Sequence, residues 1–218
     1  MGETNGRDVD AIRYAVLRKL ASGIRHSLMG ELQTIQFSAE LAARMIDSGA
    51  GGPKLDECIK QLPDQARGAA NSCKAILEWL RPDDKASTTV DEALQQCLKL
   101  AGDDWTLRGI EASTDLKSGA ARVSKPAVRE LLVTSLLALT DSHPGPIDIA
   151  IASESIGDEV VIRLSAKRVE RKTPFPPLTL YRALTYDDVV VVGKANNVPC
   201  SCADGMISLR LRILPSDG

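Results

Sequence analysis

The sequence predicts an α+β protein: an N-terminal antiparallel helical hairpin followed by an α/β sandwich. Up to residue 82 the hydrophobic residues recur with a helical period, interrupted once by the glycine-rich stretch 48–53. From about residue 108 the pattern changes to short strand-like runs around one long apolar helix. We therefore expect a frayed tail at 1–7, a helical hairpin at 8–82 and an α/β domain at 86–218.

The two helices of the hairpin are expected at about 8–47 and 54–80. Both stretches are rich in helix formers, and the first contains no proline. The second ends at Arg81-Pro82, because the residue before a proline is disfavoured in a helix. Pro63 lies inside the second helix, where it should kink the helix or cost it one hydrogen bond.

Each helix of the hairpin carries an apolar stripe at the spacing of packed helices. One hairpin cannot bury both stripes and their flanks, so we expect a twofold dimer whose two hairpins form a four-helix bundle. The alternative is that the hairpin packs only on its own C-terminal domain. The first stripe comprises Leu17, Ala21, Ile24, Leu28, Leu32, Ile35, Ala39, Ala42 and Ile46; the second comprises Leu55, Ile59, Leu62, Ala66, Ala69, Cys73, Ile76 and Leu80.

The C-terminal half predicts a mixture of strands and helices. Overlapping capping boxes at 88–92 should begin a short helix that ends near 101. Strands are expected at about 108–114, 121–123, 147–153, 159–165 and 206–214, and a helix at about 125–140 with Pro126 in its first turn. The segment 187–197 is ambiguous, since its valines favour a strand. We interpret this segment as a helix, because the order of elements in the domain that the C-terminal half resembles has a helix at this place.

Composition excludes several classes of function. The net charge is −2 and only 3% of the residues are aromatic, so neither a basic field nor a stacking platform for nucleic acid is present. No apolar run is long enough to span a membrane, and the N-terminus does not resemble a signal peptide. A cytoplasmic protein is expected.

The five cysteines are odd in number and widely spaced, which favours reduced thiols. Cys58 and Cys73 lie on an apolar stripe and are expected to be buried as small hydrophobic residues. Cys200 and Cys202 form the only close pair, but the two histidines stand in no ligand spacing, so no metal site is expected. His143 follows a predicted helix, where a histidine commonly caps the helix end.

His26 lies on the first helix about 180° from the apolar stripe, so it should face solvent. Its expected neighbours are Ser22, Gly23, Met29, Gly30 and Gln33 on the helix face, and Arg25 directly before it. A glycine inside a helix costs about 1 kcal/mol relative to alanine. Close approach of a partner to His26 would explain why glycines are tolerated there. The alternative is an incidental surface histidine.

Residues 25–35 read RHSLMGELQTI, and this stretch resembles the H-box of sensor histidine kinases. His26, Leu28, Leu32 and Ile35 match that motif in register. The resemblance implies that the histidine carries phosphate and that two hairpins form a four-helix bundle. Ser27 departs from the motif, because many kinases carry Asp or Glu there, and this weakens the interpretation as a kinase. Glu31 replaces the usual proline.

The order of elements after residue 86 is similar to the ATP-binding domain of the same kinases. Where that family carries asparagines for Mg²⁺ and phosphate, this sequence has Thr134 and Ala138, and a methyl group cannot bind a metal. The stretch AKRVE at 166–170 lacks the Asp-x-Gly-x-Gly box, and TPFPP at 173–177 replaces the glycine-rich lid. The sequence therefore predicts a degenerate ATP-binding domain without a cofactor.

This combination resembles the dimeric histidine phosphotransferases of two-component phosphorelays. The resemblance implies that His26 shuttles phosphate between aspartates of response-regulator receiver domains, which supply the Mg²⁺, and that Ser22, Arg25, Met29, Gly30 and Gln33 dock the partner. A sensor kinase is a further possible partner. Three alternatives stay open: an inactive kinase-like scaffold, a true kinase with divergent nucleotide contacts, and a structural hairpin protein.

Overall fold

The computed structural model describes residues 6–80, 83–102, 105–143, 145–171, 182–203 and 205–215. The chain divides into two compact units. The hairpin unit comprises residues 22–82, and the sandwich unit comprises residues 1–21 together with 83–218. The predicted lid replacement at 173–177 and the Arg81-Pro82 helix stop lie outside the described residues.

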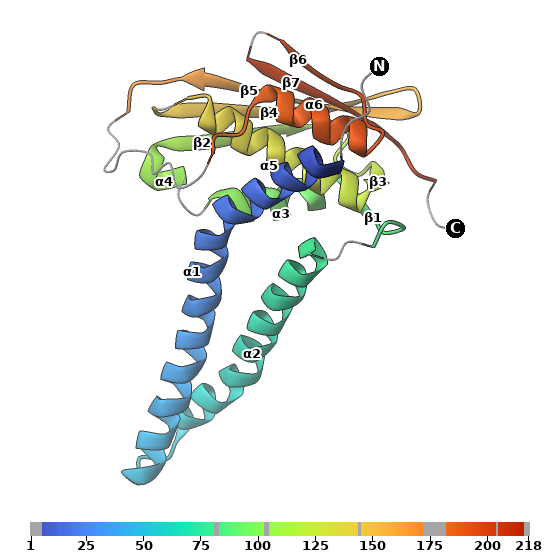
Figure 1. Cartoon of the computed structure of the whole chain (residues 1–218). Coiled ribbons are helices and arrows are strands. Elements are labelled where there is room, and N and C mark those ends of the chain that lie inside the picture. Colours follow the sequence, from blue (N-terminus) through green and yellow to red (C-terminus); the bar gives the residue numbers. More distant parts are fainter. Residues whose placement is uncertain are drawn as a thin grey trace. The chain divides into compact units, whose positions relative to one another are not determined.

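The hairpin is built from α1 (Gly6–Asp47) and α2 (Pro53–Leu80), as the periodicity predicted (Figure 1). Helix α1 begins two residues before the expected start, so Gly6 and Arg7 belong to a helix rather than a tail. The turn between the helices uses left-handed backbone at Gly49 (φ 68°) and Gly52 (φ 135°), which glycine adopts readily. Helix α2 continues through Pro63.

Polar contacts hold the two helices together within the hairpin unit. The Cys58 thiol donates to the Ser38 carbonyl (3.1 Å), and the Ser72 hydroxyl donates to the Glu31 carboxylate (2.8 Å). The apolar seam itself is only partly closed. Ala42 and Ala69 of the seam are buried, as is Cys58 on α2, but the other seam positions whose side chains the structure describes remain half-buried or exposed. Cys73 is exposed, so the prediction that both helical cysteines are buried was wrong for this residue.

The sandwich unit contains a five-stranded mixed sheet in the order β2-β4-β5-β7-β6. Strands β2 and β4 are parallel, and the other neighbours are antiparallel. A separate two-stranded pair joins β1 and β3. The strands are β1 (Ser87–Thr89), β2 (Ile110–Leu116), β3 (Arg122–Ser124), β4 (Ile147–Ile156), β5 (Glu159–Arg168), β6 (Cys200–Ala203) and β7 (Met206–Arg212).

The five predicted strands correspond to β2, β3, β4, β5 and β7, although β2 begins two residues later than expected. Strands β1 and β6 and the short helix α4 (Trp105–Arg108) were not predicted, because three or four residues carry too little periodicity. The turn between β4 and β5 uses Gly157 at φ 65°, which a hairpin turn of this kind requires.

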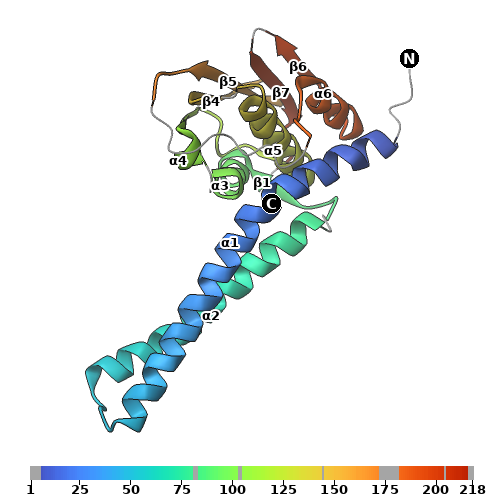
Figure 2. The same ribbon diagram turned by 60° about the vertical axis from the view of Figure 1, so that its left-hand side comes forward.

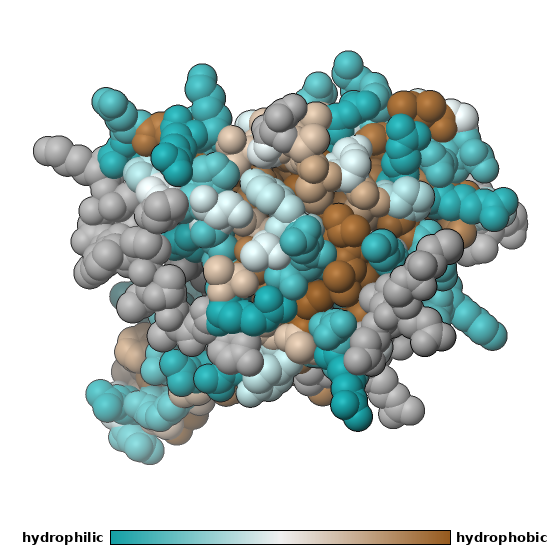
Figure 3. Space-filling model, turned by 45° about the horizontal axis from the view of Figure 1, so that its top comes forward, coloured by the Kyte–Doolittle hydropathy of each residue, from teal (hydrophilic) through white to brown (hydrophobic). Residues whose placement is uncertain are grey.

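Strand register separates the two faces of the sheet. Leu164 pairs with Ile151 and Ile207, and all three side chains point to the buried face. The opposite face carries ion pairs between neighbouring strands, including Arg163 with Glu154 at 2.6 Å. The face of the molecule seen in Figure 3 carries both hydrophilic side chains and a hydrophobic patch near its centre.

Three helices cover the buried face: α3 (Val90–Ala101), α5 (Lys125–Asp141) and α6 (Tyr186–Ala195) (Figures 1 and 2). Helix α3 begins with a capping box in which Thr89 and Glu92 bond each other's backbone N–H, as predicted. The ambiguous segment 187–197 is a helix, as we interpreted it. Thr185 and Asp188 form its capping box, which explains why the valine run does not become a strand.

The first part of α1 belongs to the sandwich unit, which the sequence analysis did not predict. Five apolar side chains of this part are buried, at the helical spacing of a second stripe: Val9, Ile12, Ala15, Val16 and Leu20. This stripe is separate from the seam predicted from Leu17 onwards. The expected domain boundaries at 8–82 and 86–218 stay a prediction.

Candidate functional site

His26 lies on α1 in the hairpin unit and is exposed to solvent, as the helical wheel predicted. No hydrogen bond or ion pair joins its imidazole to another of the described residues. The imidazole is thus exposed and is not engaged by another described residue. An exposed imidazole is suited to nucleophilic chemistry on a group that a second protein presents.

The five predicted docking residues are also exposed: Ser22, Arg25, Met29, Gly30 and Gln33. A side chain added at Gly30 would meet nothing within 4 Å, so the glycine leaves open space rather than fitting a neighbour inside the chain. The Gly30 carbonyl accepts a hydrogen bond from the Thr34 hydroxyl (2.9 Å). The structure thus leaves the helix surface beside His26 free for close approach.

Phe37 is a further residue of this surface that the sequence analysis missed. It follows His26 by three helical turns, about 20° away on the helical wheel. Its side chain is 68% exposed, and Met29 is 50% exposed. Both are large apolar side chains exposed on the part of α1 that belongs to the hairpin unit. The eleven-residue spacing from His26 was the signal in the sequence that could have revealed it.

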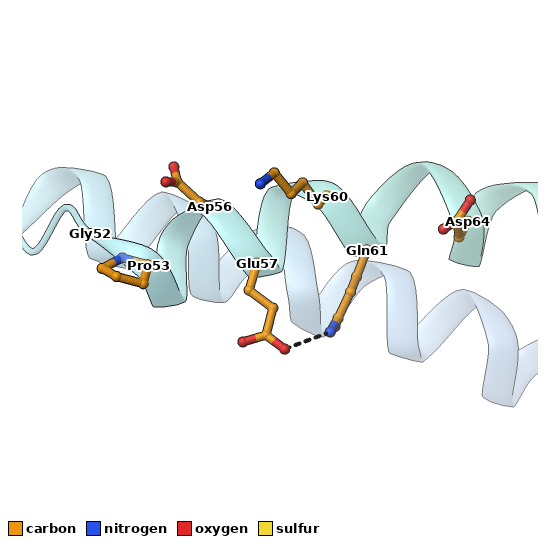
Figure 4. Close-up of a pocket in the computed structure, with 7 residues that line it drawn as sticks. All are labelled: Gly52, Pro53, Asp56, Glu57, Lys60, Gln61 and Asp64. Carbon is orange, nitrogen blue, oxygen red and sulfur yellow. Dashed lines mark hydrogen bonds between the residues drawn. The ribbon is translucent and has the colours of Figure 1, made fainter.

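A shallow pocket of the hairpin unit lies along the first turns of α2 (Figure 4). The residues that line it include three with carboxylates, Asp56, Glu57 and Asp64, and one with an ammonium group, Lys60. Gln61 donates to Glu57 at 3.3 Å. This pocket holds no histidine or cysteine, and none of the residues predicted for the site lines it.

Helix α5 carries the two positions that the family resemblance matches to asparagines for Mg²⁺ and phosphate. Thr134 and Ala138 are both 0% exposed. The Thr134 hydroxyl is already engaged, because it donates to the Glu130 carbonyl (2.8 Å). Strand β5 continues through Ala166 to Arg168, where the family has its Asp-x-Gly-x-Gly box. These residues do not fit a magnesium-nucleotide site.

The surroundings of the remaining cysteines and of His143 indicate structural roles for these residues. Burial raises the pKa of Cys97 to about 12, and burial with the neighbouring Cys202 raises the pKa of Cys200 to about 12. Neutral thiols are poor metal ligands and nucleophiles. Within the described residues, no three His, Cys, Asp or Glu side chains cluster to hold a metal. His143 Nδ1 lies 2.8 Å from the Leu139 carbonyl, at the end of α5, as its predicted capping role requires.

None of the helices in the described part of the chain is both long and apolar enough to cross a membrane. This finding agrees with the sequence, in which no long apolar run occurs.

Solved structures to which the chain is similar include histidine kinases and a phosphotransferase. The *Acinetobacter baumannii* histidine kinase AdeS matches with 13% identity and a TM-score of 0.45, covering 87% of this chain and 98% of that chain. A bacterial phosphotransferase matches with 13% identity and a TM-score of 0.41, covering 90% and 95%. The histidine kinase ThkA in complex with the response regulator TrrA matches with 12% identity and a TM-score of 0.43, covering 92% and 62%.

No family model and no curated protein matches the sequence. The structural matches describe a likeness of fold at low identity. The function must therefore be argued from the residues of this chain.

Proposed function

We propose that this protein is a histidine phosphotransferase that carries phosphate on His26 between aspartates of response-regulator receiver domains. The observation that carries the proposal is the exposed imidazole of His26 in an H-box-like helix, with an exposed surface beside it. A histidine held in the core could not reach a phosphoryl group on another protein.

The chemistry needs one nucleophile from this chain. A neutral imidazole nitrogen of His26 attacks the phosphorus of an aspartyl-phosphate, a P–N bond forms, and the P–O bond to the aspartate breaks. The receiver aspartate leaves as a carboxylate. The phosphorylated imidazole then releases the proton of its other N–H group to water. In the reverse step a second receiver aspartate takes the phosphoryl group. The receiver supplies Mg²⁺ and the charges that stabilise the transferring group.

Exposed apolar residues support docking of a receiver on α1 beside His26. Met29 and Phe37 would contribute apolar contact area, and Gly30 would allow the partner backbone to approach. Arg25 is exposed next to His26 and would favour an anionic phosphoryl group.

The partly closed seam of the hairpin supports a homodimer with a four-helix bundle. Leu32, Ile46 and Ile59 are seam positions, and 53%, 60% and 46% of their surfaces are exposed in the single chain. A second hairpin would bury them, which is the usual reason for such a stripe on a helix pair.

The sandwich supports transfer without ATP. Thr134 and Ala138 are sealed from solvent, and Ala138 offers no ligand atom. The sandwich then has a structural role, and it does not supply the phosphate that His26 carries. Isothermal titration calorimetry with Mg²⁺-ATP checks this part, and measurable binding would favour the divergent kinase.

The decisive experiment measures phosphate transfer from a panel of phosphorylated receiver domains to the full chain. We expect acid-labile label on the wild type and on His143→Ala, and none on His26→Ala. His143→Ala is the matched control, because it removes the chain's other histidine at a helix end.

If neither the wild type nor the variants accept label although receivers bind them, the scaffold interpretation replaces ours. Absence of both label and binding would favour a structural hairpin protein.

A further inference from the structure

Helix α5 is buried on every side. All its residues from 127 to 140 are buried except Glu130. The helix lies between α3 and α6 and packs on strands β5 and β7. In a sandwich of one sheet and one helix layer, the side of the central helix away from the sheet would face solvent. Here something else covers that side.

Two ion-pair contacts show that the first part of α1 lies on this outer side of α5. Arg13 binds Glu130 through two contacts, Nε to Oε1 at 2.7 Å and Nη2 to Oε2 at 3.2 Å. Lys19 Nζ lies 3.0 Å from Asp141 Oδ2, and these two side chains are only 12% and 13% exposed. Glu130 and Asp141 stand near opposite ends of α5. The contacts therefore place this part of α1 along the length of the helix.

The second stripe of α1 is buried within the sandwich unit, on the same segment that makes these two contacts. With Val16 at zero, Val9, Ile12 and Leu20 fall within about 40° of it on the helical wheel. Arg13 and Lys19 lie at about +60° and −60°, one on each side of the stripe. Four of the five buried stripe residues thus lie between the two basic residues, and the fifth, Ala15, lies beyond Lys19 at about −100°. This is the pattern of an amphipathic helix in a groove.

The matching face of α5 is apolar or small in its middle and acidic at its ends. Glu130, Thr134, Ala138 and Asp141 fall within about 40° of one another's mean direction. Thr134 and Ala138 are fully buried between the two carboxylates. Helix α6 and the segment before it reinforce both ends, because Asn196 donates to Glu130 (2.9 Å) and the Leu184 N–H donates to Asp141 (2.7 Å). The two acceptors are thus held in place before any basic residue arrives.

We propose that this face of the sandwich is a binding groove for a basic amphipathic helix, and that residues 6–21 of the chain are its resident occupant. The occupant supplies an apolar stripe at i, i+3 and i+4 spacing with a basic residue on either side. The groove supplies a buried small-residue floor and two fixed carboxylates. The proposal is independent of phosphate transfer by His26. It assigns the sandwich a new role, recognition of a helix.

A second consequence concerns exchange between copies. The same segment of another copy presents the same stripe and the same two cations, so it fits the groove once the resident segment is released. The resident segment competes at the high effective concentration of a tethered ligand. Binding in trans should therefore be weak in the wild type and strong in variants that release the segment.

The test uses full-length chains and a fluorescent peptide with the sequence of residues 6–21. Two variants are designed to release the resident segment by different means. Arg13→Glu sets a second carboxylate against that of Glu130, and Val16→Asp puts a charge into the buried stripe of the segment. Hydrogen exchange of residues 6–21 checks the release. We expect both variants to bind the peptide at least tenfold more tightly than the wild type, as measured by fluorescence anisotropy.

Charge reversal tests the specificity of the groove. A Glu130→Arg chain should prefer a peptide that carries Arg13→Glu over the natural peptide, and the Arg13→Glu chain should show the opposite preference. The double variant Arg13→Glu with Glu130→Arg restores the pair within the chain and should bind neither peptide well. Circular dichroism confirms that every variant is folded.

Three outcomes would overturn the proposal. The resident segment could stay fully protected from hydrogen exchange in both release variants. This would show that the stripe and the ion pair do not hold the segment on the sandwich. The released chains could fail to bind the peptide. The chains could also bind the natural and the charge-reversed peptides equally, which would show that the contact is not a specific groove.

Discussion

The hairpin and the sandwich bury their hydrophobic residues to very different degrees. In the sandwich, the large side chains of α5 and the central strands are fully buried, such as Leu136 and Leu164. In the hairpin, Leu32, Phe37 and Leu77 are more than half exposed. The sandwich therefore holds a closed apolar core, whereas much of the apolar surface of the hairpin is exposed in the single chain. The proposed dimer would account for this difference, and each prediction below tests one side of it.

The largest effect on stability is expected in the sandwich core. Leu136→Ala should lower the free energy of unfolding by about 2–5 kcal/mol, because a fully buried leucine leaves a cavity among packed neighbours. Chemical denaturation followed by circular dichroism measures it. Leu77→Ala is the matched control on the hairpin, where 62% of the side chain is exposed. A similar loss in both variants would remove the contrast between the units.

The next effect concerns association of the hairpin. Leu32→Glu should convert the expected dimer to a monomer, since a carboxylate would be buried without a partner at the seam. Size-exclusion chromatography with light scattering gives the mass directly. Thr34→Glu adds the same charge at an exposed position off the predicted seam and should leave the dimer intact. A monomeric wild type would contradict the four-helix bundle.

A smaller effect is expected at the capping box of α3. Thr89→Ala removes the side-chain acceptor for the Glu92 N–H and should cost about 1 kcal/mol. The Thr89 backbone N–H and the Thr88 hydroxyl lower the pKa of Glu92 below its ordinary value of 4.5. The contribution of this carboxylate to stability is therefore present above the unfolded pKa and is lost as the pH falls through the folded pKa.

Acid denaturation of Glu92→Gln measures that contribution. The variant should lose less stability than the wild type when the pH is lowered below about 4.5, the ordinary pKa of Glu92. Equal acid sensitivity in the two proteins would show that the capping carboxylate does not contribute.

Cysteine labelling sharpens the comparison without changing the fold. Cys97 should resist iodoacetamide at pH 8, because burial raises its pKa to about 12 and hides the thiol. Cys73 is exposed in the single chain, so it should react in the Leu32→Glu variant and be protected in the dimer. Mass spectrometry of tryptic peptides gives both rates. Fast labelling of Cys97 would contradict the packed core of the sandwich.

Much of the fold could be predicted from local signals. The glycine-rich turn at 48–53 and the capping box at Thr89 fixed helix boundaries to within a few residues. The second stripe of α1 was missed because the seam from Leu17 onwards explained that helix sufficiently by itself. A single helix with two stripes at different angles contacts two different surfaces. Nothing local distinguishes which surface each stripe meets.

The sequence predicted that the side chains of the candidate site face solvent. His26 and its five neighbours are exposed, as the helical wheel required. Phe37 was missed because the H-box pattern ends before it. The burial of Cys73 was predicted wrongly, since a stripe position is buried only if a second surface lies against it. That surface belongs to an association that one sequence does not describe.

The docking of residues 6–21 on the sandwich also has a consequence for the order of folding. This segment leaves the ribosome before its carboxylate partners on α5, which follow more than a hundred residues later. During synthesis its apolar stripe therefore remains exposed until α5 has been made. The hairpin that follows it can already form from local contacts. Chaperones that recognise short apolar segments with basic flanks would be able to bind this helix until the sandwich forms.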